Sequence, residues 1–340
     1  MRAAFIEKPG LVYFADKPEP QIEHGGDVKI QVRYTGICGS EVHAFHGVHP
    51  FRIPPLVSGH EYAGVVVEVG PDVKSVKPGD RVTSDPQVGC GECVFCRSGH
   101  YNQCTRKKVL GATCWSGSFG EYLVTPEATV IPLPDAVDFP SGALIEPIAV
   151  GMHPVREVGV GPGKSACFVG FGPIGMGLFL SAKYMGCQET YVTDLKQYNV
   201  DLAASMGCTL AINSRETDAA EAVLKATDGL GVDYVFLGFA TPETYETAFR
   251  AARPGGTVVQ VALPAGPLTL DFGAVYAKEL TIHGSNMYTR EDYRLVIDAI
   301  EKGMDLSHFI TDTFPIEEVD KAFDCIARQD HPIVKTMLRF

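Results

Sequence analysis

Residues 165 to 177 decide one half of the fold, and they read Ser165-Ala-Cys-Phe-Val-Gly170-Phe-Gly172-Pro-Ile-Gly175-Met-Gly177. The apolar beginning predicts a buried strand, and the run then breaks into glycines before a helical pattern begins. The three glycines allow a tight turn, a close approach of backbone to a phosphate, and close packing of the helix. A strand, a glycine turn and a helix in this order predict a dinucleotide-binding fingerprint made of Gly170, Gly172, Pro173, Ile174 and Gly175.

A carboxylate follows this fingerprint at the expected distance. Asp194 ends the next predicted strand, nineteen residues after Gly175, where a carboxylate that binds the ribose hydroxyls belongs. Its charge would repel the 2′-phosphate of NADP by about 4 kcal/mol at ~4 Å and an effective dielectric of ~20. We therefore predict NAD as the cofactor. Lys196 can offset part of the repulsion and is assigned to the same site.

Strand and helix patterns alternate from Lys164 onward. Strands are predicted over 165–170, 189–194, 209–213, 233–239, 256–262 and 280–285, with helices between them and a further helix over 290–302. Such alternation predicts a parallel, doubly wound α/β sheet. Val261, Leu263 and Ser285, which lie near the ends of the last two strands, are also assigned to the cofactor site. The tail after residue 302 is expected to be short and extended.

The first 149 residues have a different texture. Short β-branched runs over 27–34, 62–69 and 81–83 are separated by Pro, Gly and Asp, which predicts an all-β unit with turns. A chain of 340 residues is too long for one ordinary core. The change of texture near residue 150 therefore predicts two domains.

Four cysteines in this first part fall within fifteen residues, with a two-residue gap that occurs twice running: Cys90, Cys93, Cys96 and Cys104. Thiolates are soft ligands that suit a tetrahedral Zn²⁺, and four of them leave no open position for a substrate. The pattern therefore predicts a closed, structural zinc site. An iron–sulfur cluster uses similar ligands and stays open as an alternative, although no proline follows Cys104.

A second set of residues predicts an open metal site. Cys38 lies in Gly-Ile-Cys-Gly-Ser at 36–40, and His60 lies in Gly-His-Glu at 59–61. A catalytic zinc needs about three protein ligands and leaves its fourth position to water or substrate. Glu61 and Glu146 are the candidate carboxylates, and Glu146 is expected on a separate loop beside Pro147. Which of the two binds directly stays open.

These motifs, in this order, resemble those of the zinc-dependent medium-chain dehydrogenases, specifically the sorbitol dehydrogenase-like polyol branch. The resemblance covers essentially all 340 residues and includes Gly-Ala-Leu-Ile-Glu-Pro at 142–147. It implies a GroES-like barrel catalytic domain over 1–149, a Rossmann NAD-binding domain over 150–287, and a return of 288–340 to the catalytic domain. The active site is then expected between the domains. Two zinc ions per chain are implied, one catalytic and one structural.

The resemblance also implies roles for individual residues. Cys38 and His60 become ligands of the catalytic zinc, which acts as a Lewis acid on the substrate hydroxyl while NAD accepts hydride. Glu146 points to polyols, because the alcohol dehydrogenase branch typically has a second cysteine there. Glu41 departs from the pattern, which usually has Asp supporting the histidine ligand. The implied proton relay consists of Ser40 and His43. The implied substrate contacts are Phe45, Phe119 and Asn286.

Charge and cysteine usage narrow the possible partners. The chain has 29 basic and 41 acidic residues and no basic cluster, so neither nucleic acid nor an anionic membrane is expected as a partner. No apolar run reaches the roughly 20 residues of a membrane span, and no signal peptide is suggested. We therefore expect a cytoplasmic protein whose remaining cysteines are reduced: Cys114, Cys167, Cys187, Cys208 and Cys325. A homo-oligomer, a dimer or tetramer, is also expected.

The sequence therefore predicts an oxidoreductase that transfers hydride from a secondary alcohol to NAD and gives a ketone. Polyols, sugar alcohols, diols and cyclitols are the substrate classes, with threonine or butanediol oxidation as close variants. A zinc-free quinone reductase is disfavoured, because that branch generally lacks both cysteine sets. A non-catalytic dinucleotide-binding protein is the alternative outside enzymes. The substrate, its stereochemistry and the physiological direction stay open.

Overall fold

The computed structural model describes residues 1–112, 115–264 and 266–340, and it divides into two compact units. One unit combines Met1–Glu146 with Thr289–Phe340, and the other is Pro147–Tyr288. Among the described residues, no helix combines the length and the apolar character needed to cross a membrane.

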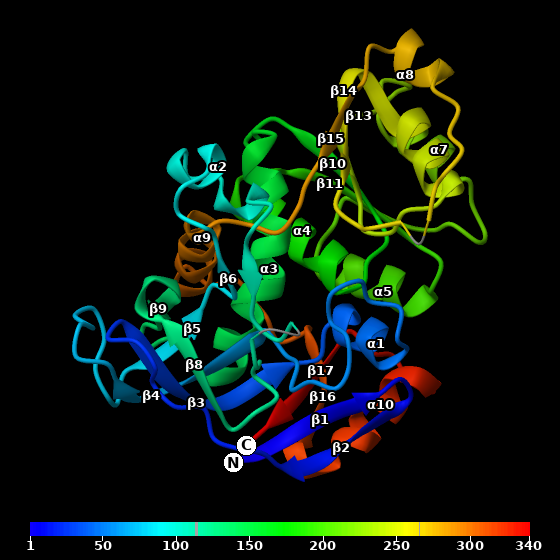
Figure 1. The fold of residues 1–340 in the computed structure, drawn as a ribbon. Helices are drawn as coiled ribbons and strands as arrows, with labels where there is room; N and C mark the ends of the chain where they lie inside the picture. The colour runs from blue at the N-terminus through cyan, green and yellow to red at the C-terminus, as the bar shows by residue number, and fades with distance from the viewer. Residues whose placement is uncertain (113–114, 265) are drawn as a thin grey trace. The chain divides into compact units, whose positions relative to one another are not determined.

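The second unit is built around one parallel sheet whose strand order is β12-β11-β10-β13-β14-β15 (Figure 1). Its strands are β10 (Ser165–Val169), β11 (Glu189–Asp194), β12 (Leu210–Asn213), β13 (Val232–Leu237), β14 (Ala252–Gln260) and β15 (Thr281–Gly284). The helices between them are α4 (Pro173–Tyr184), α5 (Gln197–Ser205), α6 (Ala219–Ala226), α7 (Pro242–Ala251) and α8 (Gly273–Ala277). This order confirms the predicted doubly wound fold, and the strand order reverses between β10 and β13.

Strand β10 shows why this sheet has helices on both faces. All five of its residues are buried, as expected for a central parallel strand. Cys167 and Val169 point into a core shared with α6 and α7. Phe168, between them, points to the opposite face and packs edge-on against Phe179 of α4, with ring centroids 5.9 Å apart. The fingerprint helix α4 is thereby held against the strand that precedes it.

The first unit contains a seven-stranded sheet in the order β16-β17-β3-β4-β5-β9, with β8 also paired to β3. Apolar side chains of β3 and β4, among them Ile30, Val32 and Val66, form one core of this unit. The two ends of the chain thus contribute to one sheet, through β3, β4, β5, β8 and β9 and through β16 and β17, while β1 pairs with β2 and β6 with β7 in two separate two-stranded sheets. The strands are β1 (Arg2–Lys8), β2 (Leu11–Asp16), β3 (Asp27–Gly36), β4 (Glu61–Val69), β5 (Arg81–Ser84), β6 (Gln87–Val88), β7 (Lys108–Val109), β8 (Tyr122–Pro126), β9 (Val130–Pro132), β16 (Ile310–Pro315) and β17 (Lys335–Arg339).

Helices supplement this sheet, and two of them differ from expectation. The tail was expected to be extended, but it contains helix α10, which buries Val319, Ala322 and Phe323 on one face. Residue 146 was expected on a loop, but it lies inside helix α3, because the apolar run around it is completely buried as a helix and tolerates Pro147 and Pro154. The helices and short turns here are α1 (Gly39–Phe45), α2 (Val94–Arg97), η1 (Tyr101–Gln103), η2 (Glu127–Thr129), α3 (Phe139–Glu157), α9 (Arg290–Glu301), η3 (Ile316–Glu318) and α10 (Val319–Arg328). The part of α3 from Pro147 onward belongs to the second unit.

Candidate active site

Three strands of the first unit bring the candidate catalytic residues together. In the β3–β4 pair, Gly36 at the end of β3 lies opposite Glu61 at the start of β4. On its other side, the end of β3 pairs with the last three residues of β17, and Met337 lies opposite Gly36. Cys38 follows β3, His60 precedes β4, and Lys335 is the first residue of β17. Antiparallel pairing therefore places all three residues at the same end of these strands.

The donor atoms of Cys38, His60 and Glu61 all lie within 4.8 Å of one another. Sulfur, imidazole nitrogen and carboxylate oxygen form a donor set that suits Zn²⁺, so this site fits a zinc ion. Glu146 is buried on α3 and contributes to the electrostatic environment of His60. The structure thus brings the two motifs of residues 36–40 and 59–61 together.

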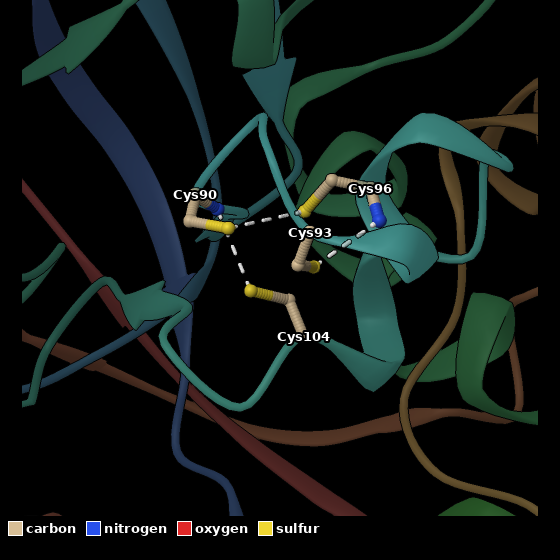
Figure 2. Close-up of side chains that lie close together, drawn as sticks. All are labelled: Cys90, Cys93, Cys96 and Cys104. Atoms are coloured by element: carbon tan, nitrogen blue, oxygen red, sulfur yellow. Dashed lines mark hydrogen bonds between the residues drawn. The ribbon is translucent and has the colours of Figure 1, made fainter.

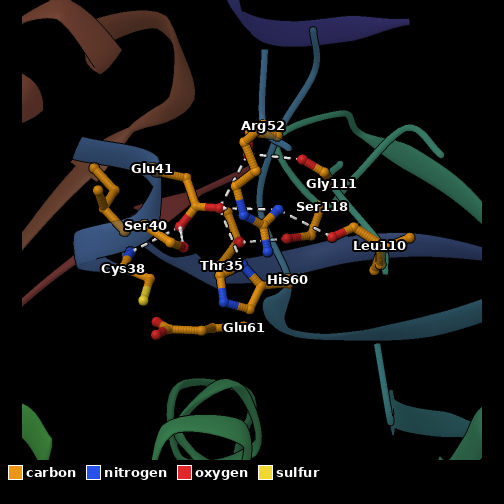
Figure 3. A network of polar contacts seen from close by, with 12 residues as sticks. Thr35, Cys38, Ser40, Glu41, Arg52, His60, Glu61, Leu110, Gly111 and Ser118 are labelled. Atoms are coloured by element: carbon orange, nitrogen blue, oxygen red, sulfur yellow. Dashed lines mark hydrogen bonds and ion pairs between the residues drawn. The ribbon is translucent and has the colours of Figure 1, made fainter. Parts of the chain in front are cut away.

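The Glu41 side chain is hydrogen-bonded to both Cys38 and His60 (Figure 3). Its carboxylate accepts hydrogen bonds from His60 Nδ1 at 3.0 Å and from the backbone N–H of Cys38 at 3.1 Å. Ser58 donates to the same carboxylate at 3.0 Å, and Arg52 Nη1 lies 3.5 Å from it. Glu41 therefore fulfils the supporting role that an Asp usually has, and it also caps helix α1, which starts after Cys38.

This network fixes the state of the histidine. Burial alone would raise the pKa of Glu41, but His60 and Arg52 outweigh it and hold the pKa far below its usual value. Burial would likewise lower the pKa of His60, but Glu41 raises it well above 6.5. An ionised Glu41 can only accept, so Nδ1 of His60 carries a proton and Nε2 is the nitrogen left for a metal. The carboxylate also makes the imidazole a more basic ligand.

Glu61 has a cationic partner that the sequence analysis missed. Lys335 Nζ donates to both carboxylate oxygens at 2.8 Å, and both side chains are buried. Nearby Gly36 makes room for this pair, because a Cβ atom there would lie 2.1 Å from Glu61 Oε2. Burial would lower the pKa of Lys335, but Glu61 and Cys38 outweigh it and raise the pKa, so the ammonium stays charged.

The expected relay and substrate residues of this unit lie around helix α1. Ser40 is half-buried and its hydroxyl donates to Glu41 at 3.4 Å. His43 is exposed one turn later, on the same side of the helix as Ser40. Phe45 is half-buried and packs against Phe323. Phe119 is completely buried and packs against the same ring, so in this structure it presents no surface to a ligand.

The four predicted cysteine ligands converge in a separate lobe around α2 (Figure 2). Their sulfur atoms lie within 4.8 Å of one another, and the described cysteines form no disulfide; Cys114 lies outside the described residues. The backbone N–H groups of Cys96 and Cys90 point at Cys93 Sγ and Cys104 Sγ, at 3.4 and 3.5 Å. Such N–H groups stabilise thiolates. Backbone hydrogen bonds from Glu92 and Cys93 also lower the pKa of Cys90 to about 6.

The fingerprint of the second unit forms the predicted loop between β10 and α4. Gly170 has φ of +88°, which favours glycine, and Gly172 caps α4. A Cβ atom on Gly175 would lie 1.9 Å from the carbonyl oxygen of Gly170, so only glycine fits there. The loop lies at the carboxyl end of β10, where the strand order reverses, and Pro173 opens the helix whose N-terminus would face the phosphates.

Asp194, which was expected to bind the ribose hydroxyls, also accepts hydrogen bonds from two backbone N–H groups. Its Oδ2 accepts from the backbone N–H of Phe171 at 2.7 Å, and its Oδ1 accepts from that of Lys196 at 2.8 Å. The carboxylate therefore also holds the glycine loop in place. The remaining predicted residues lie beyond the carboxyl ends of neighbouring strands: Val261 and Leu263 after β14, and Ser285 and Asn286 after β15.

Comparison with known proteins identifies the family. The alcohol dehydrogenase GroES-like domain matches residues 24–135, and the zinc-binding dehydrogenase domain matches residues 173–302. The chain is 34% identical over 321 residues to "Probable D-xylulose reductase A" of Arthroderma otae, covering 92% of this chain and 90% of the relative.

The chain belongs to the zinc-dependent medium-chain dehydrogenases. It is also 33% identical to L-idonate 5-dehydrogenase of Vitis vinifera, covering 90% of this chain and 86% of that enzyme. Galactitol-1-phosphate dehydrogenase of Escherichia coli has the same fold, with a TM-score of 0.93, 27% identity and complete coverage of both chains. This dehydrogenase is therefore a zinc- and NAD-dependent oxidoreductase of the polyol branch, as predicted.

Sequence reasoning missed two charged residues that contact the predicted site. Arg52 follows a loop with no recognisable motif, and its position beside Glu41 depends on the fold of the whole unit. Lys335 left no distinct signal, since its short strand also contains Thr336 and a second cation, Arg339. Its partner lies 274 positions away in the chain, so no local pattern connects the two.

Proposed function

We propose that this dehydrogenase oxidises the penultimate secondary hydroxyl of an open-chain polyol or sugar acid. The two curated relatives described above are named for D-xylulose and for position 5 of L-idonate. In both molecules the reacting carbon is next to a terminal CH₂OH group. A terminal 1,2-diol is therefore the shared chemical feature, and it is the part of the substrate that we assign to the catalytic zinc.

The observation that carries the ligand assignment is the pair formed by Glu61 and Lys335. Both oxygens of Glu61 are bonded to the ammonium group, so its charge is neutralised locally. The Cys38 thiolate and Glu146 then bring two negative charges to a divalent cation. We therefore propose that Cys38, His60 and Glu146 hold the catalytic zinc, directly or through water, while Glu61 stays with Lys335.

Each unit has its own part in the proposed reaction. When bound, zinc acts as a Lewis acid on the substrate hydroxyl and NAD accepts the hydride. Ser40 takes the hydroxyl proton, and His43, exposed on the same side of α1, passes it to solvent. In the second unit, the N-terminus of α4 binds the phosphates and Asp194 binds the ribose. Cys90, Cys93, Cys96 and Cys104 hold a structural zinc.

The test of this function is a screen for NAD reduction by the purified enzyme. Xylitol, sorbitol and L-idonate contain the terminal 1,2-diol, while 2,3-butanediol and threonine do not. We expect turnover with the first group and at least tenfold lower kcat/KM with the second. The Cys38→Ser variant is the matched control and should be inactive. Equal or better turnover of butanediol or threonine would refute the proposed substrate class.

The ligand assignment has a separate test in two glutamine variants. Glu146→Gln is expected to reduce kcat strongly and leave the KM for NAD nearly unchanged, because an amide is a poorer ligand and supplies no charge. Glu61→Gln is expected to reduce kcat less than Glu146→Gln does. Zinc content is measured alongside. If Glu146→Gln keeps full zinc and full activity on the best substrate, Glu146 does not belong to the zinc site.

We also propose that the enzyme is a cytoplasmic homo-oligomer, a dimer or tetramer. The absence of disulfides among the described cysteines is consistent with a reducing compartment. Strand β15 is an edge of its sheet, and apolar side chains are exposed on and near it, namely Ile282, Tyr276 and Phe272. Such an edge favours pairing with a second copy. Light scattering should show an oligomer that Ile282→Lys weakens.

A further inference from the structure

A third group of metal-binding side chains lies outside the two zinc sites of the family. Asp312 of β16, Cys325 of α10 and His331 of the loop before β17 place one donor atom each within 4.8 Å of one another. All three belong to the first unit, where α10 packs against β16 (Figure 1). None of them belongs to a motif that the sequence analysis used.

The distances among these donors are close to those of a shared ion. His331 Nε2 lies 2.9 Å from Asp312 Oδ1 and 4.0 Å from Cys325 Sγ. In a tetrahedral zinc site with ordinary bond lengths, neighbouring donor atoms are about 3.3 to 3.6 Å apart. A shift of about half an ångström in each contact would therefore suffice to accommodate the ion.

The histidine is already oriented as a metal ligand. Its other ring nitrogen, Nδ1, lies 2.9 Å from Asp330 Oδ1, so a carboxylate supports the ring from behind. This arrangement of carboxylate, histidine and metal is common in zinc sites. Because Nδ1 can donate to Asp330, Nε2 is the nitrogen directed at Asp312 and Cys325.

The carboxylate and the thiol complete a balanced donor set. Asp312 Oδ2 is buried and makes no hydrogen bond among the described residues, so this carboxylate has unused acceptor capacity. A thiolate and a carboxylate bring two negative charges, which match a divalent cation. Cysteine and histidine favour Zn²⁺ or a similar thiophilic metal over Mg²⁺ or Ca²⁺. Three protein donors leave a fourth position for water.

We propose that Asp312, Cys325 and His331 form a third divalent-metal site, selective for Zn²⁺-like cations, that fastens the turn after α10 to β16. Without the metal, the same residues form the ion pair between His331 and Asp312. Half-exposed ligands make this site weaker than the closed four-cysteine site. The site is independent of turnover, because it contacts none of the residues assigned to substrate or cofactor.

Equilibrium dialysis against micromolar Zn²⁺ tests this proposal, with metal counted per chain. We expect three equivalents in the wild type and two in both Cys325→Ser and His331→Gln. The matched controls are Cys208→Ser, a half-buried thiol elsewhere, and His308→Gln, an exposed histidine beside Asp305; both should retain three. Circular dichroism verifies that each variant is folded.

Cobalt substitution provides a second readout that does not depend on total counts. The absorbance difference between wild type and Cys325→Ser, both loaded with Co²⁺, should show one lost thiolate-to-cobalt charge-transfer band. Saturation of the wild type at two equivalents would overturn the proposal. So would a third equivalent that persists in both variants, or a cobalt spectrum that Cys325→Ser leaves unchanged.

Discussion

At the scale of single residues, the charge of Lys335 is the basis of the proposed division of roles between Glu61 and Glu146. With Glu61 neutralised by the ammonium group, a second carboxylate can approach the metal without making the site anionic. An anionic site would oppose ionisation of a substrate hydroxyl. The lysine therefore belongs to the charge balance of the site although it is not a metal ligand.

Replacing this lysine should expose its role. Lys335→Met leaves a buried carboxylate unpaired, which typically costs about 3 to 5 kcal/mol of stability. We expect a lower thermal midpoint and at least a tenfold loss of kcat, with the KM for NAD nearly unchanged. Adding Glu61→Gln should restore much of the stability. Lys29→Met, which removes another buried strand lysine paired with a glutamate, is the control and should retain kcat.

At the scale of elements, local motifs were predictable and long-range contacts were not. The cysteine lobe and the glycine loop are each made by consecutive residues, so spacing alone indicated both. Glu146 was misplaced on a loop, because prolines usually end helices and burial of the surrounding apolar run is a tertiary effect. Helix α10 was missed although its apolar residues recur at helical spacing, at positions 319, 322, 323 and 326, so this periodicity could have indicated it.

The cysteine lobe should respond as a closed structural site. Cys93 both contributes a thiolate and caps α2, since its sulfur accepts from Cys96 N–H. Cys93→Ser should therefore remove one zinc per chain and loosen residues 88–106, and leave the Cys38 site intact. Metal analysis and hydrogen exchange measure both effects. A variant with complete metal content and an unchanged thermal midpoint would contradict a structural zinc.

Two substitutions should separate the two roles of Asp194, which are cofactor preference and support of the glycine loop. Asp194→Ala should raise the KM for NAD and narrow the preference for NAD over NADP, while kcat changes much less. It also removes the acceptor of Phe171 N–H. Asp194→Asn keeps an oxygen for that N–H and removes only the charge, so it should narrow the preference with a smaller rise in KM. Unaltered cofactor preference in both variants would exclude this role.

At the scale of the whole molecule, one buried acid should make stability depend on pH. Burial raises the pKa of Asp85 to about 7, although Tyr101 donates to it at 2.5 Å. The same tyrosine oxygen accepts from Arg290 N–H, so this contact joins the cysteine lobe to α9. Between about pH 4 and 7 the folded state holds a proton that the unfolded state has lost. Stability should therefore fall as pH rises through this window.

The Asp85→Asn variant tests this dependence. One group of this kind changes the free energy of unfolding by about 1.4 kcal/mol per pH unit. We expect the wild type to lose stability relative to the variant from pH 5 to 7, as measured by urea unfolding. The single tryptophan, Trp115, lies in the first unit and reports on it by fluorescence. For Asp324→Asn, at an exposed position, the free energy of unfolding should depend on pH as it does in the wild type. The same pH dependence in Asp85→Asn as in the wild type would refute the prediction.

The shared sheet of the first unit has a consequence for synthesis on the ribosome. Strand β3 emerges early, but its neighbour β17 and the lysine that faces Glu61 emerge only after the entire second unit. At about 5 to 20 residues per second, the ~270 residues between Glu61 and Lys335 take roughly 14 to 55 s. During that interval β3 has an open edge and Glu61 has no cation. The nascent chain is thus most exposed to aggregation and to chaperones before its last strand arrives.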